Sequence, residues 1–198
     1  MLNSFYKQFG NPTGFMGNVV GKILAANNKE RTGWVLSFMD VKPDDKILEI
    51  GYGPGLAIEK LEKKIKNGLI VGVDVSDVML KQASRRNFEG IKQGKVKLHQ
   101  GTIDNLNYKN NFFDHVFGIN VSLFWKDPVA EFKKIRNLLK PGGSLLIALQ
   151  PRYAKSNLQV REIGERVKNE IIRAGFTNFH IEFKEFDPID AFCIWANP

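Results

Sequence analysis

Short apolar runs alternate with amphipathic segments along most of the chain, which predicts strands that alternate with helices. The predicted strands span residues 46–50, 69–74, 96–99, 115–119 and 144–149, and the predicted helices between them span 56–66, 76–86 and 129–139. The Lys-Pro-Gly-Gly segment at 140–143 is expected to end the last of these helices. Alternation of this kind indicates βα units and a parallel sheet with helices on both faces.

The C-terminal part of the chain follows a different pattern. A long amphipathic helix is predicted over 156–174, and two apolar runs at 176–183 and 189–195 are close enough in sequence to pair antiparallel. We therefore expect an α/β fold with a doubly wound, seven-stranded, mostly parallel sheet that ends in an antiparallel hairpin.

The residues before the first strand predict two short helices, over 18–26 and 31–39. With 198 residues the chain has the length of one domain. We interpret residues 1–43 as a helical cap or lid and residues 44–198 as the α/β core.

The composition is that of a globular protein, with 43% hydrophobic and 25% charged residues. A single cysteine, Cys193, can form neither an internal disulfide nor a zinc site, and its apolar neighbours indicate a core position. The N-terminus carries no export signal, and no run approaches the roughly 20 apolar residues of a membrane span. The sequence therefore predicts a cytoplasmic protein.

The net charge of +8 would favour polyanions as partners. The lysines are dispersed, however, and the densest group, at 59–66, alternates in sign as on the solvated face of a helix. A nucleic-acid partner is therefore disfavoured but stays open.

The strongest chemical signal is the segment Ile-Leu-Glu-Ile-Gly-Tyr-Gly-Pro-Gly, in which the first predicted strand runs into three glycines, Gly51, Gly53 and Gly55. Glycines at this density allow positive φ and let a ligand touch the main chain. The third glycine stands one place too early for the GxGxxG fingerprint of dinucleotide-binding folds, because residue 56 is leucine. In addition, Glu49 would repel a pyrophosphate and attract an ammonium or sulfonium group.

An acid at the end of the second strand completes the pattern. Asp74 lies about 20 residues beyond the glycines, where a carboxylate can accept hydrogen bonds from both ribose hydroxyls of a nucleoside. Without the glycine loop, the same residue would be interpreted as a turn or helix cap.

These motifs resemble the class I S-adenosylmethionine-dependent methyltransferases. The resemblance covers the chain from about residue 44 to its end and includes the closing hairpin. It rests on five motifs in order, namely Leu48–Gly55, Val73–Ser76, Gly101–Asp104, Phe113–Phe117 and Leu139–Leu146.

The resemblance implies a cofactor, S-adenosylmethionine, with S-adenosylhomocysteine as product. Its methionine part would lie over the loop of Gly51, Tyr52, Gly53 and Gly55, near Glu49; Asp74 would bind the ribose, and Val75 and Ile103 would sandwich the adenine. Where many relatives have an acid, this chain has Thr102, so the adenine amine would meet either its hydroxyl or Asp104.

The end of the fourth strand would lie beside the methyl group, with Asn120 against the cofactor and Trp125 either lining a substrate cavity or packing in the core. The Asn-Pro-Pro-Tyr motif of enzymes that methylate amide or base nitrogens is missing there. Methyl transfer requires alignment more than a general base, and the sequence identifies no catalytic residue. His99, His115 and His180 lack metal-ligand spacing, so we expect no metal.

The N-terminal segment carries an apolar cluster that includes Phe5, Tyr6 and Phe15, with glycines that would let it hinge. It is expected to line the substrate site as a lid, or else only to cover the sheet edge. The sequence as a whole predicts a methyltransferase that acts on a small molecule. An RNA or protein methyltransferase and a non-catalytic cofactor-binding module are the alternatives, and the acceptor atom and oligomeric state stay open.

Overall fold

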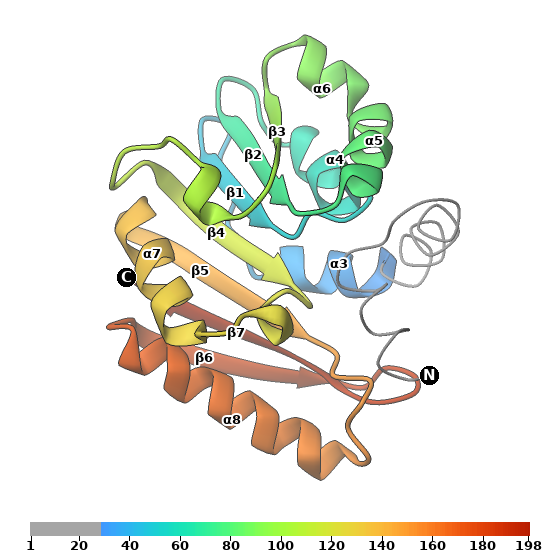
Figure 1. Ribbon diagram of the computed structural model, residues 1–198, viewed down its shortest axis with the longest axis vertical. Helices are drawn as coiled ribbons and strands as arrows, with labels where there is room; N and C mark the ends of the chain where they lie inside the picture. The colour runs from blue at the N-terminus through green and yellow to red at the C-terminus, as the bar shows by residue number, and fades with distance from the viewer. Residues whose placement is uncertain (1–28) are drawn as a thin grey trace. The chain divides into compact units, whose positions relative to one another are not determined.

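The structure is a computed structural model that describes residues 29–198 (Figure 1). The chain divides into two compact units, of which the first ends at Asn107 and the second spans Tyr108–Pro198. The predicted helix at 18–26 and the cluster of Phe5, Tyr6 and Phe15 lie outside the described residues. The interpretation of 1–198 as one domain with a cap at 1–43 stays a prediction.

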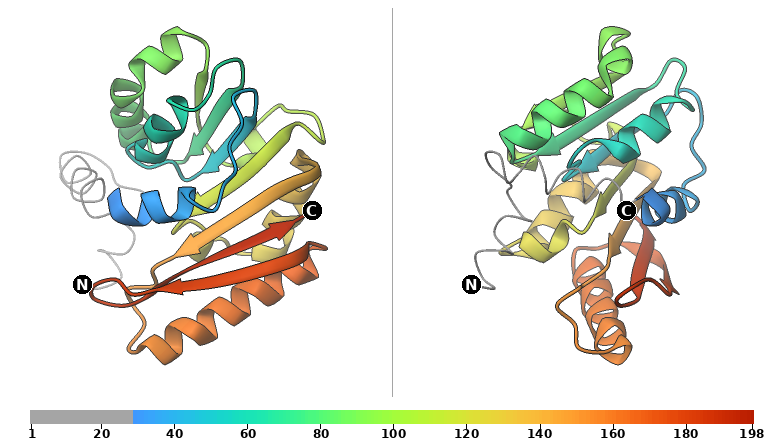
Figure 2. Two further views of the ribbon diagram at one scale, coloured as in Figure 1. Left: turned by 180° about the vertical axis from the view of Figure 1, so that it is seen from behind. Right: turned by 90° about the vertical axis from the view of Figure 1, so that its right-hand side faces the viewer.

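The first unit is built on three parallel strands, in the order β3 (Val96–Gln100), β2 (Leu69–Asp74) and β1 (Lys46–Ile50). The strand pairs are in register from Lys46 opposite Leu69 and from Ile70 opposite Val96. Helices α4 (Leu56–Glu62), α5 (Asp77–Arg86) and α6 (Phe88–Lys92) pack against the strands, and α3 (Lys29–Leu36) packs against α4 (Figures 1 and 2).

The second unit has four strands, in the order β4 (Phe113–Ile119), β5 (Leu139–Leu149), β7 (Ala191–Asn197) and β6 (Thr177–Lys184). Strands β4 and β5 are parallel, whereas β7 is antiparallel to both of its neighbours. Helices α7 (Pro128–Leu138) and α8 (Asn157–Arg173) pack against each other, and α8 runs along β6 and β7 (Figure 2). The predicted α/β fold with seven mostly parallel strands and an antiparallel C-terminal hairpin is confirmed.

The helix starts are fixed by local capping. Ser76 accepts a hydrogen bond from the backbone N–H of Met79, and Asp127 and Ser156 do the same for Ala130 and Gln159. The main chain of β1, β2 and β5 is flanked by buried aliphatic side chains, among them Leu48, Val71 and Ile147. The segments predicted as strands from continuous apolar runs are therefore the buried ones.

Two predictions about the ends of helices need correction, and one short helix was not predicted. The helix predicted to reach residue 66 ends at Glu62, because the backbone N–H groups of Lys66, Asn67 and Gly68 turn back onto the carbonyl oxygen of Pro43. The Lys-Pro-Gly-Gly segment lies inside β5 as an irregularity of the ladder with β4, since the helix before it already ends at Leu138. The short helix α6 was not predicted, because five residues carry no periodic signal.

Candidate functional site

All three glycines of the loop between β1 and α4 have a left-handed backbone. Their φ angles are 71° at Gly51, 52° at Gly53 and 78° at Gly55, in the region where a Cβ atom is strained. The Gly51 N–H donates to the carbonyl oxygen of Val73 at 2.7 Å, and the Gly55 N–H closes a turn onto Tyr52 at 2.9 Å. The positive φ angles expected from the glycine spacing are thus confirmed.

The glycines differ in what surrounds them. Among the described residues, a Cβ atom on Gly53 would meet no heavy atom within 4 Å, whereas one on Gly55 would collide with Asn87 and would stand 2.9 Å from the Cβ of Ala83. Asn87 is buried, and its amide nitrogen donates to the carbonyl oxygens of Gly55 at 3.1 Å and Ala83 at 2.9 Å. The absence of a side chain at Gly55 therefore allows the loop to pack closely against α5, whereas at Gly53 it leaves open space beside the main chain.

Asp74 connects this loop to the end of β2. Its Oδ2 accepts the N–H of Gly53 at 2.8 Å, and its Oδ1 accepts the N–H of Ser76 at 2.9 Å. Burial raises the pKa of the Asp74 carboxyl, and the two backbone hydrogen bonds partly offset that rise. Each carboxylate oxygen retains a lone pair for a further donor, such as a ligand hydroxyl.

Glu49, on β1, is the least compensated charge of the site. Its side chain is 3% exposed, and Oε2 has no hydrogen-bond partner among the described residues. Burial is the main reason that the pKa of its carboxyl is raised well above the ordinary value, and the Asp74 carboxylate raises it further. A buried carboxyl next to a half-buried one favours a cation, because an approaching positive charge offsets the cost of burying a carboxylate and the repulsion between the two groups.

Tyr52 has its side chain in the core. It is 3% exposed, and its hydroxyl donates to the carbonyl oxygen of His99 at 3.2 Å. Its ring lies where a Cβ atom on Gly72 would stand. Burial raises the pKa of the Tyr52 phenol, and the negative charges of Asp74 and Glu49 add to that rise. Only the backbone of Tyr52 therefore contributes to the outer side of the loop.

The ends of β2 and β3 are brought together by their register. Asp74 pairs with Gln100, and the N–H of Gly101 donates to the carbonyl oxygen of Asp74 at 2.8 Å. Val75 is 44% exposed there, a high value for an aliphatic side chain beside a buried strand, whereas Ile103 is 6% exposed. Both predicted adenine neighbours thus belong to adjacent strand ends.

Thr102 caps the start of a short helix through hydrogen bonds with Asn105. Its backbone N–H and its hydroxyl both donate to Oδ1 of Asn105, at 2.8 and 3.3 Å. Asn105 and Asp104 belong to the short 3₁₀ helix η1 (Ile103–Asn105) that follows Thr102. The Thr102 hydroxyl would therefore meet a ligand with its lone pairs and not with its proton.

In the second unit, Asn120 follows β4 with an unusual backbone. Its φ is 59°, a left-handed value that asparagine tolerates better than most residues. Its N–H donates to the carbonyl oxygen of Ala148, and its Oδ1 accepts the N–H of Gln150, both at 2.8 Å. Because the oxygen is used in this way, the Asn120 amide group is held with its nitrogen available as a donor.

Gln150 was not predicted as part of any site, although it fixes this region. It is 4% exposed, and its amide nitrogen donates to the carbonyl oxygens of Asp187 at 3.0 Å and Ile189 at 2.9 Å. One side chain therefore ties the end of β5 to the segment that connects β6 and β7. Asn87 was missed as well. Each of these two side chains bonds to a residue 32 or more positions away in sequence, which no local pattern predicts.

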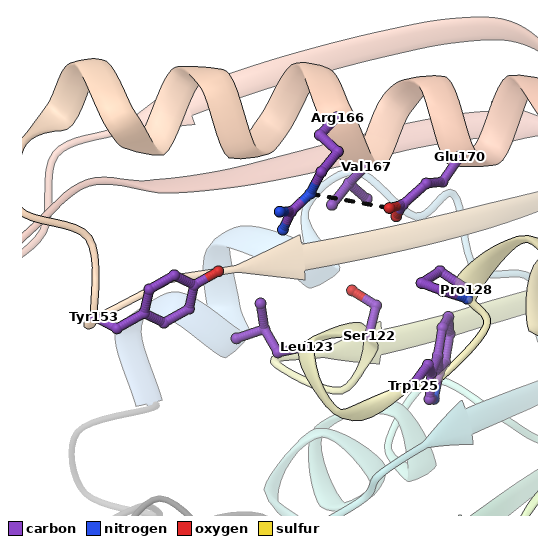
Figure 3. A pocket seen from close by; sticks show the side chains of 8 residues that line it. All are labelled: Ser122, Leu123, Trp125, Pro128, Tyr153, Arg166, Val167 and Glu170. Atoms are coloured by element: carbon purple, nitrogen blue, oxygen red, sulfur yellow. Dashed lines mark ion pairs between the residues drawn. The ribbon is translucent and has the colours of Figure 1, made fainter. Parts of the chain in front are cut away.

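Trp125 is one of the residues that line a cavity in the second unit (Figure 3), whose volume is about 320 Å³. It also packs edge-on against Phe132, with ring centres 5.1 Å apart. Trp125 is thus a packing residue and also lines a cavity, and its role toward a substrate stays a prediction.

The remaining candidate groups occupy structural positions. His115 shares a 2.7 Å hydrogen bond with the Ser144 hydroxyl, and within residues 29–198 no three His, Cys, Asp or Glu side chains gather closely enough to hold a metal ion. Cys193 is buried as predicted, and burial raises the pKa of its thiol to about 12. None of the helices found in this part of the chain has the length and apolar character needed to cross a membrane.

Comparison with known proteins identifies the fold and the family. A family profile described as a methyltransferase domain matches residues 48–147. The uncharacterized methyltransferase YdaC of Bacillus subtilis (strain 168) is 34% identical over 179 residues, which cover 90% of this chain and 97% of YdaC.

Two solved structures share the fold. One is a chain of the complex between the Haloferax volcanii Trm112 methyltransferase activator and a candidate methyltransferase, with a TM-score of 0.76 and 18% identity over 91% of this chain and 93% of that one. The other is the Haemonchus contortus phosphoethanolamine N-methyltransferase 2 with phosphomonomethylethanolamine and S-adenosylhomocysteine, with a TM-score of 0.67 and 18% identity over 85% of this chain. The present chain spans about half of that enzyme, 52% of its length. The domain match and the near full-length similarity to YdaC show that the chain belongs to the class I S-adenosylmethionine-dependent methyltransferases.

Proposed function

We propose that this enzyme binds S-adenosylmethionine at the glycine loop of the first unit and transfers its methyl group to a small molecule. Two observations on the described residues carry the cofactor proposal. A Cβ atom on Gly53, whose N–H donates to the Asp74 carboxylate, would meet none of their heavy atoms within 4 Å, and the buried Oε2 of Glu49 has no hydrogen-bond partner among them. The carboxyl groups of this site can accept hydrogen bonds and attract a positive charge. A nucleoside that carries a cation offers both, because its ribose hydroxyls are donors and its cation is positively charged.

The residues present fit such a ligand. Asp74 would accept the ribose hydroxyls while its hydrogen bond to Gly53 keeps the loop in place, and Glu49 would face the ammonium group. Val75 and Ile103 would hold the adenine between them. The backbone of Gly51, Gly53 and Gly55 would let the methionine part approach closely.

When bound, S-adenosylmethionine supplies a methyl group activated by a sulfonium and leaves as S-adenosylhomocysteine. The contribution of this chain is then to bind and orient the reactants, because an in-line displacement is accelerated mainly by alignment. Asn120, with its amide nitrogen held as a donor by Gln150, would hydrogen-bond the cofactor or the acceptor.

A small acceptor is favoured because a structure that shares the fold contains a small phosphorylated amine, phosphomonomethylethanolamine. Substrate choice is assigned to the N-terminal segment with Phe5, Tyr6 and Phe15, acting as a lid, and to Trp125. Removal of residues 1–16 should then abolish turnover and leave the binding of S-adenosylhomocysteine nearly intact. Loss of both together, or of neither, would contradict a lid.

The experiment that tests the function is incubation of cell extract with methyl-labelled S-adenosylmethionine and the purified enzyme, followed by separation of labelled small molecules from labelled macromolecules. Label in the small-molecule fraction supports the proposal. The net charge of +8 favours RNA or protein as a second candidate. Label confined to macromolecules, with acceptor binding that weakens steeply with salt, would establish that candidate instead.

A further inference from the structure

The cavity of the second unit is a candidate binding site in its own right. It has a volume of about 320 Å³, at the lower end of the range for small-molecule sites, which begins at roughly 300 Å³. It is bordered by the segment after β4, the loop after β5 and the middle of α8 (Figure 3). The lining side chains are Ser122, Leu123, Trp125, Pro128, Tyr153, Arg166, Val167 and Glu170.

Arg166 presents a guanidinium to this cavity. Its Nε lies 3.9 Å from Oε1 of Glu170, one helical turn further along α8. Within residues 29–198, its terminal nitrogens make no protein hydrogen bond. In Figure 3 these nitrogens and the hydroxyl of Tyr153 point into the same space. Glu170 thus occupies the Nε edge of the guanidinium and leaves the other edge for a ligand.

Ser122 provides a second and independent sign of a ligand. The residue is 6% exposed, and its Oγ has no hydrogen-bond partner in the described part of the chain. Figure 3 shows this hydroxyl directed into the cavity from the side opposite Arg166. A buried hydroxyl without a partner costs free energy, which a ligand that hydrogen-bonds to it would recover.

The charges of the cavity limit which ligand fits. The guanidinium, the Tyr153 hydroxyl and the Ser122 hydroxyl are donors, and together they suit an oxyanion. The carboxyl of Glu170 stands beside them; its side chain is 20% exposed, and burial raises its pKa while Arg166 and Arg173 lower it. A dianion such as a phosphate monoester would be repelled by this carboxylate more strongly than a singly charged group.

The other walls are apolar. Leu123, Trp125, Pro128 and Val167 offer a surface for a flat hydrocarbon body, with the indole of Trp125 as the largest element. We propose that this cavity binds a small monocarboxylate with an apolar body, whose carboxylate is held by Arg166, Tyr153 and Ser122. The proposal concerns the second unit alone and does not depend on the identity of the methyl donor or acceptor.

Four probes with the same aromatic body test it, namely benzoate, benzyl alcohol, benzylamine and phenyl phosphate. Binding to the full-length protein is measured by calorimetry and by ligand NMR at one ionic strength. We expect benzoate to bind about tenfold more tightly than the alcohol or the amine, and more tightly than phenyl phosphate. The expected gain is modest because it comes from one charge-assisted hydrogen-bond pair at an exposed arginine, whose side chain is 61% exposed.

Three variants locate the binding. Arg166→Gln should lower the affinity for benzoate about tenfold and leave that for benzyl alcohol unchanged, and Ser122→Ala should lower it about threefold. Lys168→Gln is the matched control, because Lys168 lies on the same helix and pairs with Glu165 at 2.8 Å, outside the cavity. Circular dichroism checks that each variant is folded.

The proposal is overturned if none of the probes binds, if benzoate binds no better than benzyl alcohol, if phenyl phosphate binds most tightly, or if Lys168→Gln weakens benzoate as much as Arg166→Gln does. Titration with S-adenosylhomocysteine is run separately on the same variants. Its failure would count against the proposed cofactor site and not against this cavity, and the two proposals are therefore distinguishable.

Discussion

Replacement of Gly53 tests whether the glycine loop is a ligand site or only a turn. A Cβ atom at this position meets none of the described residues within 4 Å, so this part of the chain has room for a side chain. At a φ of 52°, backbone strain should destabilise the folded alanine variant by about 1 to 2 kcal/mol. Alanine also lowers the conformational entropy of the unfolded chain, which offsets about 0.4 to 1 kcal/mol of this loss. We expect Gly53→Ala to lower the free energy of unfolding by about 1 kcal/mol.

Gly94 is the matched control for the backbone strain caused by a side chain at a positive φ. It lies in the same unit, between α6 and β3, has a φ of 74°, and also has nothing within 4 Å of its Cβ position. Substitutions at Gly53 and Gly94 should therefore cost similar stability. Only those at Gly53 place atoms where the methionine part of the cofactor would lie.

The assay combines chemical denaturation with calorimetric titration of S-adenosylhomocysteine. Gly53→Val should weaken binding by about 2.8 kcal/mol or more, a hundredfold, while Gly94→Val leaves it unchanged. Gly55→Ala serves as a contrast, because its Cβ would collide with Asn87 and Ala83 and should destabilise the fold by about 1 to 3 kcal/mol beyond the backbone strain. Full binding by Gly53→Val, or equal losses at Gly53 and Gly94, would refute the reasoning.

Four further substitutions and treatments test other parts of the structure. Asp74→Ala should weaken S-adenosylhomocysteine binding by about 1 to 3 kcal/mol and also loosen the loop, since its carboxylate accepts from two backbone N–H groups; an unchanged dissociation constant contradicts the assignment. Because the pKa of Glu49 is raised in the fold, its proton is retained at pH values where the unfolded chain has lost it, so stability falls as pH rises above the ordinary value of 4.5. Glu49→Gln should therefore be more stable than the wild type at pH 7 and equally stable near pH 4 in urea unfolding, yet bind cofactor more weakly; a variant less stable at pH 7 would show that the carboxylate is already compensated. Asn87→Ala should lower the free energy of unfolding by about 1 to 3 kcal/mol, measured in the same way, because it removes the two buried hydrogen bonds that the Asn87 amide donates to the carbonyl oxygens of Gly55 and Ala83; no loss would mean that water replaces the amide. Cys193, with a thiol pKa of about 12, should resist a thiol-specific reagent at pH 8 until the protein unfolds, and rapid labelling of the native protein would show that the thiol is accessible.

Local signals were sufficient for the elements of the core. Strands β1 and β2 begin and end at the predicted residues, because continuous apolar runs bounded by polar residues and glycines have few other ways to be buried. The start of α5 was also predicted, since Ser76 caps it through its own neighbour three residues on. The five residues of α6 could not be predicted, because the helix is shorter than two turns and is held by contacts with β3 and α5.

By itself, the sequence determined that a glycine loop with positive φ angles follows the first strand and that acids stand before it and at the end of the second. Those properties depend on residue type and spacing along a short stretch of chain. Only the tertiary structure decided, for residues 29–198, that Gly53 is open while Gly55 is packed against Asn87, that the Tyr52 ring is buried, and that Glu49 Oε2 lacks a partner. These distinctions arise from side chains 20 or more residues away in sequence, whose approach is set by how the strands and helices pack and not by local preference.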